Sequence, residues 1–261
     1  MSRFVSYLAC LSLLIGCTRP SGPGEIPAPS PLPKPEEPVK LSDAIAEGFD
    51  GEMSSLLQCN VRTTRDDFRY YPGFPSISER GSEVMLMRID PLDAAGIQRG
   101  PSVSSVDKCH YGTYSARFRV PNTIKAQGDL GVCASFGVSD GESSVTLEIR
   151  LSDPQAIYLI SDKETVVRPQ GFNANSRFYI YGFDWSENSV TWWLQTSASG
   201  EKTVIATTEA AALNVPAVFS FNYYYSKLKP VENRPNSVQA PAYAYEIELD
   251  SLNYTPSVQD E

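Results

Sequence analysis

The sequence predicts an all-β fold, a sandwich of two antiparallel sheets in a jelly-roll arrangement. Short segments of alternating apolar and polar residues recur from residue 46 to residue 257, and clusters of Gly, Pro, Asn and Asp separate them. Helical signals are few, and no spacing of the strand–helix–strand type occurs. Many short strands without crossover helices are typical of sandwiches and jelly rolls.

Four runs with a period of two give the clearest strands, at residues 83–88, 114–120, 144–151 and 244–249. Successive side chains of a strand point to opposite faces of its sheet. The third run therefore has one apolar face and one polar face. Residues 206–213 fit either a short helix or a strand followed by a loop.

Residues 177–195 predict a hairpin. Aromatic side chains stand at alternating positions on both sides of Glu187-Asn188-Ser189, which supplies the turn. Such rings bury large areas against a facing sheet, so Trp185 and Trp192 are expected in the core.

The N-terminus has the pattern of a bacterial lipoprotein signal. Arg3 is followed by an apolar run at residues 4–15 and by Leu14-Ile15-Gly16-Cys17. We expect residues 1–16 to be a signal peptide and Cys17 to carry a lipid. The run is too short to span a bilayer comfortably, and no later stretch approaches the roughly 20 apolar residues that a transmembrane helix needs. Thr and Arg, not Asp, follow the cysteine, which favours the outer membrane of the cell envelope.

A proline-rich stalk is predicted at residues 17–45, before the sandwich at 46–257 and a tail at 258–261. Residues 20–38 contain eight prolines among nineteen residues. Such a segment favours the polyproline II conformation at about 3.1 Å per residue, which allows a reach of roughly 70 Å.

The net charge of −9 and the single histidine disfavour nucleic-acid binding and a His-rich metal site. Partners should be neutral or cationic. Once Cys10 has left with the signal and Cys17 is lipidated, three cysteines remain in a compartment that permits disulfides. Cys109 pairs with Cys133 or with Cys59, and the spacing does not decide between them.

The hairpin sequence RFYIYGFDWSENSVTWWLQ resembles the "DFHTYGIEWTPDSITWYVDG" segment of glycoside hydrolase family 16, the laminarinase, agarase and lichenase group with a concanavalin A-like jelly roll. Neighbouring segments follow the family order. Residues 111–121 are similar to "YGRFEARIKLP", residues 131–138 to "GVWPAFWML" and residues 216–224 to "PMRLMLNLW". The resemblance covers about residues 46–257 and implies a polysaccharide partner.

The catalytic strand of the family reads E-x-D-x-(x)-E, because a retaining glycosidase needs two carboxyl groups about 5 to 5.5 Å apart. The matching strand here is 144–151. In one register Glu148 is the acid/base, with Ser144 and Thr146 in place of the nucleophile and the assisting Asp. In the other, Glu148 is the nucleophile, Arg150 replaces the Asp, and Ser152 or Asp153 stands at the acid/base position, of which Asp153 alone can supply a carboxyl. Neither register restores the full acidic row.

The resemblance also implies sugar-contacting positions. Cys133 and Gly137 replace the cleft tryptophans, so stacking would depend on tyrosine. Asp250, or Glu248 beside it, stands where family members hold a structural calcium, and no other cofactor is expected. The expected carbohydrate-binding residues are Ser144, Thr146, Arg150, Arg117, Asn222 and Tyr224.

Three functions are compatible with these residues. The first is a carbohydrate-recognition domain, anchored in the envelope and catalytically impaired. The second is an active retaining endo-β-glycosidase of the glucanase or galactanase type that uses Glu148 and Asp153. The third is a structural or adhesive envelope lipoprotein. Since a fold does not imply a function, the site must decide between them.

Overall fold

A computed structural model describes residues 39–50, 52–60, 68–75, 83–89, 101–121, 132–209, 213–225 and 245–257. Contacts divide the chain into a unit from Met1 to Pro38 and a compact unit from Val39 to Glu261, which holds all the described strands. The predicted signal peptide, the lipidation site Cys17, most of the predicted stalk and the tail 258–261 lie outside the described residues.

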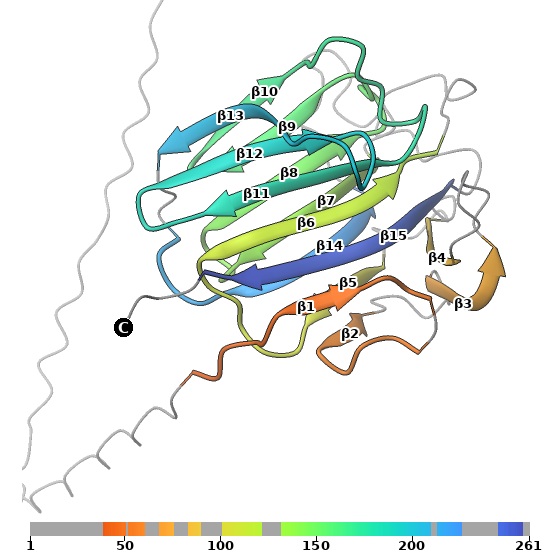
Figure 1. Cartoon of the computed structure of the whole chain (residues 1–261), viewed down its shortest axis with the longest axis horizontal. Coiled ribbons are helices and arrows are strands. Elements are labelled where there is room, and N and C mark those ends of the chain that lie inside the picture. The colour runs from red at the N-terminus through yellow and green to blue at the C-terminus, as the bar shows by residue number, and fades with distance from the viewer. Residues whose placement is uncertain are drawn as a thin grey trace, which may run out of the picture. The chain divides into compact units, whose positions relative to one another are not determined.

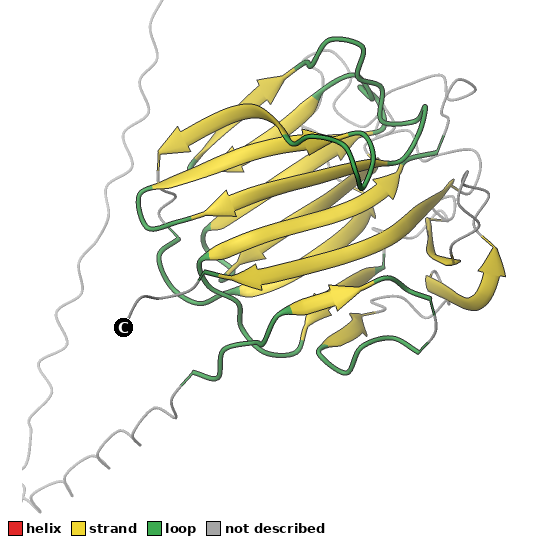
Figure 2. Ribbon diagram, viewed as in Figure 1, coloured by secondary structure: helices red, strands yellow, loops and turns green. Residues whose placement is uncertain are grey.

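The described residues form strands, turns and loops, with no helix among them (Figure 2). In this part of the chain no helix has the length and apolar character needed to cross a membrane. The strands are β1 (Ile45–Glu47), β2 (Leu57–Asn60), β3 (Phe68–Pro75), β4 (Glu83–Ile89), β5 (Ser102–Ser105), β6 (Gly112–Arg119), β7 (Val132–Ser139), β8 (Ser144–Arg150), β9 (Ile157–Ser161), β10 (Lys163–Val167), β11 (Tyr179–Trp185), β12 (Ser189–Gln195), β13 (Thr203–Glu209), β14 (Val218–Tyr225) and β15 (Tyr245–Pro256).

The strands form two sheets that lie one behind the other in Figure 1. The eight-stranded sheet has the order β13-β12-β11-β6-β15-β4-β3, and β1 also pairs with β15. The seven-stranded sheet has the order β10-β9-β8-β7-β14-β5-β2. The ladders between these strands are antiparallel. The predicted all-β sandwich is confirmed.

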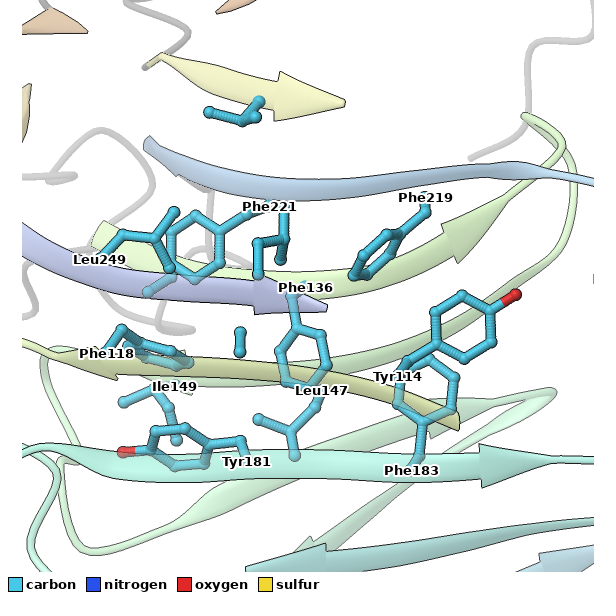
Figure 3. Packing of buried hydrophobic residues seen from close by; sticks show 14 of the residues in the cluster. Tyr114, Phe118, Phe136, Leu147, Ile149, Tyr181, Phe183, Phe219, Phe221 and Leu249 are labelled. Carbon is cyan, nitrogen blue, oxygen red and sulfur yellow. The ribbon is translucent and has the colours of Figure 1, made fainter. Parts of the chain in front are cut away.

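Alternation along the strands places one face of each sheet in a shared core. In β6, Tyr114, Ala116 and Phe118 are buried while the intervening residues are partly exposed. Rings from opposite sheets meet edge to face, Tyr114 with Phe219 at 5.0 Å and Phe118 with Phe221 at 5.1 Å between centroids (Figure 3). This geometry suits the charge distribution of aromatic rings, and such pairs stabilise a core by about 0.5–1.5 kcal/mol each beyond the area they bury.

The predicted hairpin consists of β11 and β12. The backbone N–H of Ser186 donates to the carbonyl of Ser189 at 2.9 Å and closes the turn. Trp185 and Trp192 are both buried in the core, as the sequence predicted.

Trp193 points to the other face of the same hairpin, where its indole lies across Gly182 of β11. A Cβ atom at position 182 would come within 2.1 Å of Cζ2 of the indole, so only glycine fits beneath the ring. The Lys202 ammonium lies over the same ring, 4.1 Å from its centroid.

The last strand of the eight-stranded sheet, β13, contains a bulge. Trp192 pairs with Ala206, whereas Trp193 pairs with Val204, so Ile205 is an extra residue in the ladder. The segment 206–209 is therefore strand, and the strand alternative for this part of the sequence is correct.

The three cysteines within the described ranges form no disulfide with one another, and both predicted disulfides are wrong. Cys109 bridges to Ala217 before β14, whereas Cys133 pairs with Tyr224 near the end of that strand. The seven steps from Ala217 to Tyr224 span about 23 Å at about 3.3 Å each. A disulfide needs Cα atoms within about 7 Å.

Cys59 is also distant from Cys109. It lies opposite Val103, which lies opposite Phe221, and four residue steps of about 3.3 Å separate Phe221 from Ala217. Two of the three thiols are buried, and that of Cys59 is exposed. Burial raises the pKa of Cys109 to about 11.

Candidate functional site

The outer face of the seven-stranded sheet, turned away from the core, carries most of the predicted site. In β8, Val145, Leu147 and Ile149 are fully buried in the core. The alternate residues therefore point outward, and they are Ser144, Thr146, Glu148 and Arg150.

The register of β7 and β14, which follow β8 on one side in the sheet, extends this face. Ser135 of β7 lies opposite Glu148, and Asn222 of β14 lies opposite Ser135. One step along, Cys133 lies opposite Arg150, and Tyr224 lies opposite Cys133. The six residues Ser144, Thr146, Glu148, Arg150, Asn222 and Tyr224 thus share one face, as predicted.

Glu148 lies at the centre of this face and is only 5% exposed. Its Oε1 accepts a hydrogen bond from Nε of Arg150 at 2.6 Å, and its Oε2 accepts one from the hydroxyl of Tyr224. Burial and the charge of Glu148 raise the pKa of Tyr224 well above its ordinary value, so the phenol stays protonated and remains a donor. Both carboxylate oxygens of Glu148 are therefore occupied.

Arg150 contacts two carboxylates, those of Glu148 and Glu164, and the ring of Tyr158. Its terminal nitrogen lies 2.5 Å from Oε2 of Glu164, and its guanidinium carbon lies 3.7 Å from the ring centroid of Tyr158. Burial acts to lower the pKa of Arg150, but the hydrogen bonds that it donates to Glu164 and Glu148 outweigh burial and raise the pKa. The guanidinium covers the aromatic face that Tyr158 would otherwise offer to a ligand.

Asp153, the second predicted catalytic carboxylate, follows β8 in the turn before β9. Arg168 binds it with both terminal nitrogens, at 2.9 Å and 2.7 Å, and the hydroxyl of Tyr158 donates to it at 2.8 Å. The hydrogen bonds from Arg168 lower the pKa of Asp153. A general acid needs a pKa raised toward the working pH, so this environment suits a permanent ion pair better than proton donation.

The contacts connect Glu148 to Asp153 only indirectly. Glu148 binds Arg150, the guanidinium of Arg150 stacks on Tyr158, and the hydroxyl of Tyr158 binds Asp153. The path of contacts between the two carboxyl groups thus runs through a cation and an aromatic ring. A retaining glycosidase has its two carboxyl groups facing one substrate bond at about 5 to 5.5 Å.

Arg117 does not belong to this face, and its predicted placement is wrong. It lies on β6, which belongs to the eight-stranded sheet, where it pairs with Ile180 and Ser251. There its guanidinium forms an ion pair with Asp250 at 2.5 Å and stacks on Phe178 at 4.6 Å. Tyr114 of the same strand is buried in the core.

The candidate calcium ligand Asp250 is bound to Arg117, and Glu248 is bound to Arg119 at 2.6 Å. Within the described ranges no three His, Cys, Asp or Glu side chains gather closely enough to hold a metal ion. These carboxylates have guanidinium partners, which differ in charge and shape from the oxygen-only shell of a calcium site. A structural calcium therefore remains only a prediction.

The structure adds Tyr158, Glu164 and Arg168 to the site, which the sequence reasoning did not include. All three follow β8 in the chain, on β9, on β10 and directly after β10. The turn signal Asp153-Pro154 before the alternating segment 157–161 could have indicated that these strands continue the sheet beside β8. Their pairing to Arg150 and Asp153 depends on side-chain directions that alternation alone does not give.

No protein-family model matches the chain, and no curated protein matches it. Solved structures do match. A prokaryotic β-1,3-1,4-glucanase (lichenase) derived from a mouse hindgut metagenome is 16% identical, with a TM-score of 0.60 over 83% of this chain and 100% of that chain. The β-glucanase of Bacillus licheniformis is 16% identical, with a TM-score of 0.57 over 84% of this chain and 100% of that chain.

The catalytic domain of an endo-1,3-β-glucanase (laminarinase) from Thermotoga petrophila is 12% identical, with a TM-score of 0.57 over 85% of this chain and 100% of that chain. At these identities the likeness concerns the backbone arrangement alone. The chain has the sandwich fold of β-glucanases and laminarinases, and it spans the whole length of these relatives.

Proposed function

We propose that this chain is a carbohydrate-recognition protein of the cell envelope, built on a glucanase-like scaffold and held to the outer membrane by a lipid on Cys17, with little or no hydrolytic activity. The fold shared with β-glucanases supports a glycan as the ligand. The outer face of the seven-stranded sheet, with Glu148 at its centre, is the proposed binding surface.

One observation supports the proposed loss of hydrolysis: both carboxylate oxygens of Glu148 already accept hydrogen bonds, one from Arg150 and one from Tyr224. These two donors draw negative charge from the carboxylate and so weaken it as a nucleophile, and hydrolysis also needs a second carboxyl that can hold a proton. Asp153 is held ionised by Arg168, so neither role has a suitable group.

The charges of the site favour a neutral glycan. Glu148, Glu164 and Asp153 contribute three negative charges, and Arg150 and Arg168 contribute two positive charges, which leaves a net charge of −1 for these five residues. The whole chain carries −9. Sulfated or uronic acid polysaccharides would be repelled.

Binding should also be weak. The ring of Tyr158 is covered by Arg150, so Tyr224 is the main aromatic contact that remains. We expect dissociation constants nearer millimolar than micromolar, about −4 rather than −8 kcal/mol.

The test combines a glycan array, titration of the hits and an assay of reducing ends released from β-1,3 and mixed-linkage glucans, agarose and carrageenan. We expect binding to a neutral glycan that Tyr224→Ala weakens at least about tenfold, and no release above blank. Tyr111→Ala serves as the control because Tyr111 stacks on His110, next to the other sheet. Binding that ignores Tyr224 would place the ligand elsewhere.

An active glycosidase is the second candidate. It is favoured by the position of Tyr158, which lies opposite Glu148 in the ladder and donates a hydrogen bond to Asp153, so both candidate carboxylates lie beside the same residue. Hydrolysis that disappears in Glu148→Gln and persists in Glu142→Gln, a change of an exposed glutamate at the β7–β8 turn, would establish it. Absence of both hydrolysis and glycan binding would favour the structural or adhesive envelope protein.

A further inference from the structure

Strand β13 is an edge strand of the eight-stranded sheet, next to β12 (Figure 1). Among the described residues its only strand partner is β12. Positions 203 to 208 read Thr-Val-Ile-Ala-Thr-Thr, without charge, Pro or Gly, and Val204 is 60% exposed. An edge of this kind offers backbone N–H and C=O groups to another strand.

The bulge at Ile205 determines which side chains of this edge share a face. Val204 lies opposite Trp193, and Glu209 lies opposite Ser189, on the outer face. Lys202, whose ammonium lies over the Trp193 ring, belongs to the same face. Thr208 instead turns inward and accepts a hydrogen bond from Nε1 of Trp192 at 3.2 Å.

We propose that β13 pairs antiparallel with β13 of a second copy of this chain, around a two-fold axis between Ile205 and Ala206. In this register Lys202 lies opposite Glu209 of the second copy, and Glu209 lies opposite its Lys202. Val204 lies opposite Thr207 of the second copy. A two-fold contact repeats each pair, so the interface gains two Lys–Glu pairs.

Charge pairing and side-chain direction favour this register over registers shifted by two residues. A shift by two residues in one direction puts Lys202 opposite Thr207, and a shift in the other direction puts Glu209 opposite Val204. In a strand without a bulge, residues 202 and 209 would point to opposite faces. The extra residue brings both to the outer face, so the proposed register matches charges and faces together.

The contact is short, which sets the expected affinity. One pair of seven-residue strands buries less than the roughly 1,200 Å² typical of stable complexes. We therefore expect a reversible dimer with a dissociation constant between about 10 µM and 1 mM.

Sedimentation equilibrium tests the proposal on the full chain with Cys17→Ser, which prevents lipidation, under reducing conditions because Cys59 is exposed. The apparent mass should rise toward that of a dimer with concentration. Glu209→Lys and Lys202→Glu should each weaken the dimer about fivefold or more, and the double exchange should restore it. Glu142→Lys, with the same change in charge at the distant β7–β8 turn, should have no effect.

A chain that stays monomeric at 1 mM protein would overturn the proposal. A dimer that tolerates Glu209→Lys, or that the double exchange does not restore, would overturn it as well. Circular dichroism of each variant checks that its fold is retained, and both charged side chains are exposed, so folding should not be affected.

Discussion

Replacing Arg150 by methionine should destabilise the protein, because it leaves a buried charge without its counter-ion. Glu148 is 5% exposed and would keep only the hydroxyl of Tyr224 as a partner. Breaking a buried ion pair on one side usually costs about 3–5 kcal/mol. The side chain of Arg150 is itself 19% exposed, so water can approach the gap, and we expect a loss of about 2–3 kcal/mol.

The double variant Arg150→Met, Glu148→Gln carries no buried charge there and should recover most of the stability.

Urea denaturation followed by tryptophan fluorescence measures both effects, and Trp185 and Trp192 report on the core. Arg168→Met is the matched control, since its ion pair with Asp153 is much more exposed, at 58% and 28%. A loss equal to that of Arg168→Met, or a double variant no more stable than Arg150→Met, would refute the account of the buried pair.

Three further outcomes are expected. Arg168 lowers the pKa of Asp153, so this pair stabilises the fold above pH 3.8, and the contribution is lost as the pH falls through the lowered pKa. The difference in stability between the parent protein and Arg168→Met should therefore be constant above about pH 5 and vanish in stronger acid. Thiol labelling of the native protein should modify Cys59 at once and spare Cys109, whose thiolate fraction at pH 8 is about 0.1%; equal labelling would contradict the burial. Detergent fractionation should move Cys17→Ala from the membrane to the soluble fraction. Retention of the variant on the membrane after export and signal cleavage would disprove the anchor.

The fold was predictable because it depends on alternation. A period of two assigns every second residue to the core, whatever its neighbours on the other strands are, and the hairpin at 177–195 adds an unambiguous turn. The same rule placed Glu148 and Arg150 on one face of β8, and the family resemblance added Asn222 and Tyr224 to that face.

One error arises where the position of one sheet relative to another matters. Alternation places Arg117 on the polar face of its strand but does not say to which sheet that strand belongs, and β6 lies in the sheet opposite to β8. Disulfide pairing fails for a different reason, because sequence spacing does not show that Cys109 and Cys133 lie toward opposite ends of the same strand, β14.

The separation of the two faces of β8 has a consequence for design. Its inward side chains, such as Leu147, hold the sheets together, while Ser144 and Thr146 point outward and take no part in the aromatic core. Randomising Ser144 and Thr146, together with an outward position of β14 such as Asn222, should yield libraries in which most members still fold, since each change leaves the core packing and the buried Glu148–Arg150 pair intact. The sandwich is thus a scaffold on which new binding specificities can be selected.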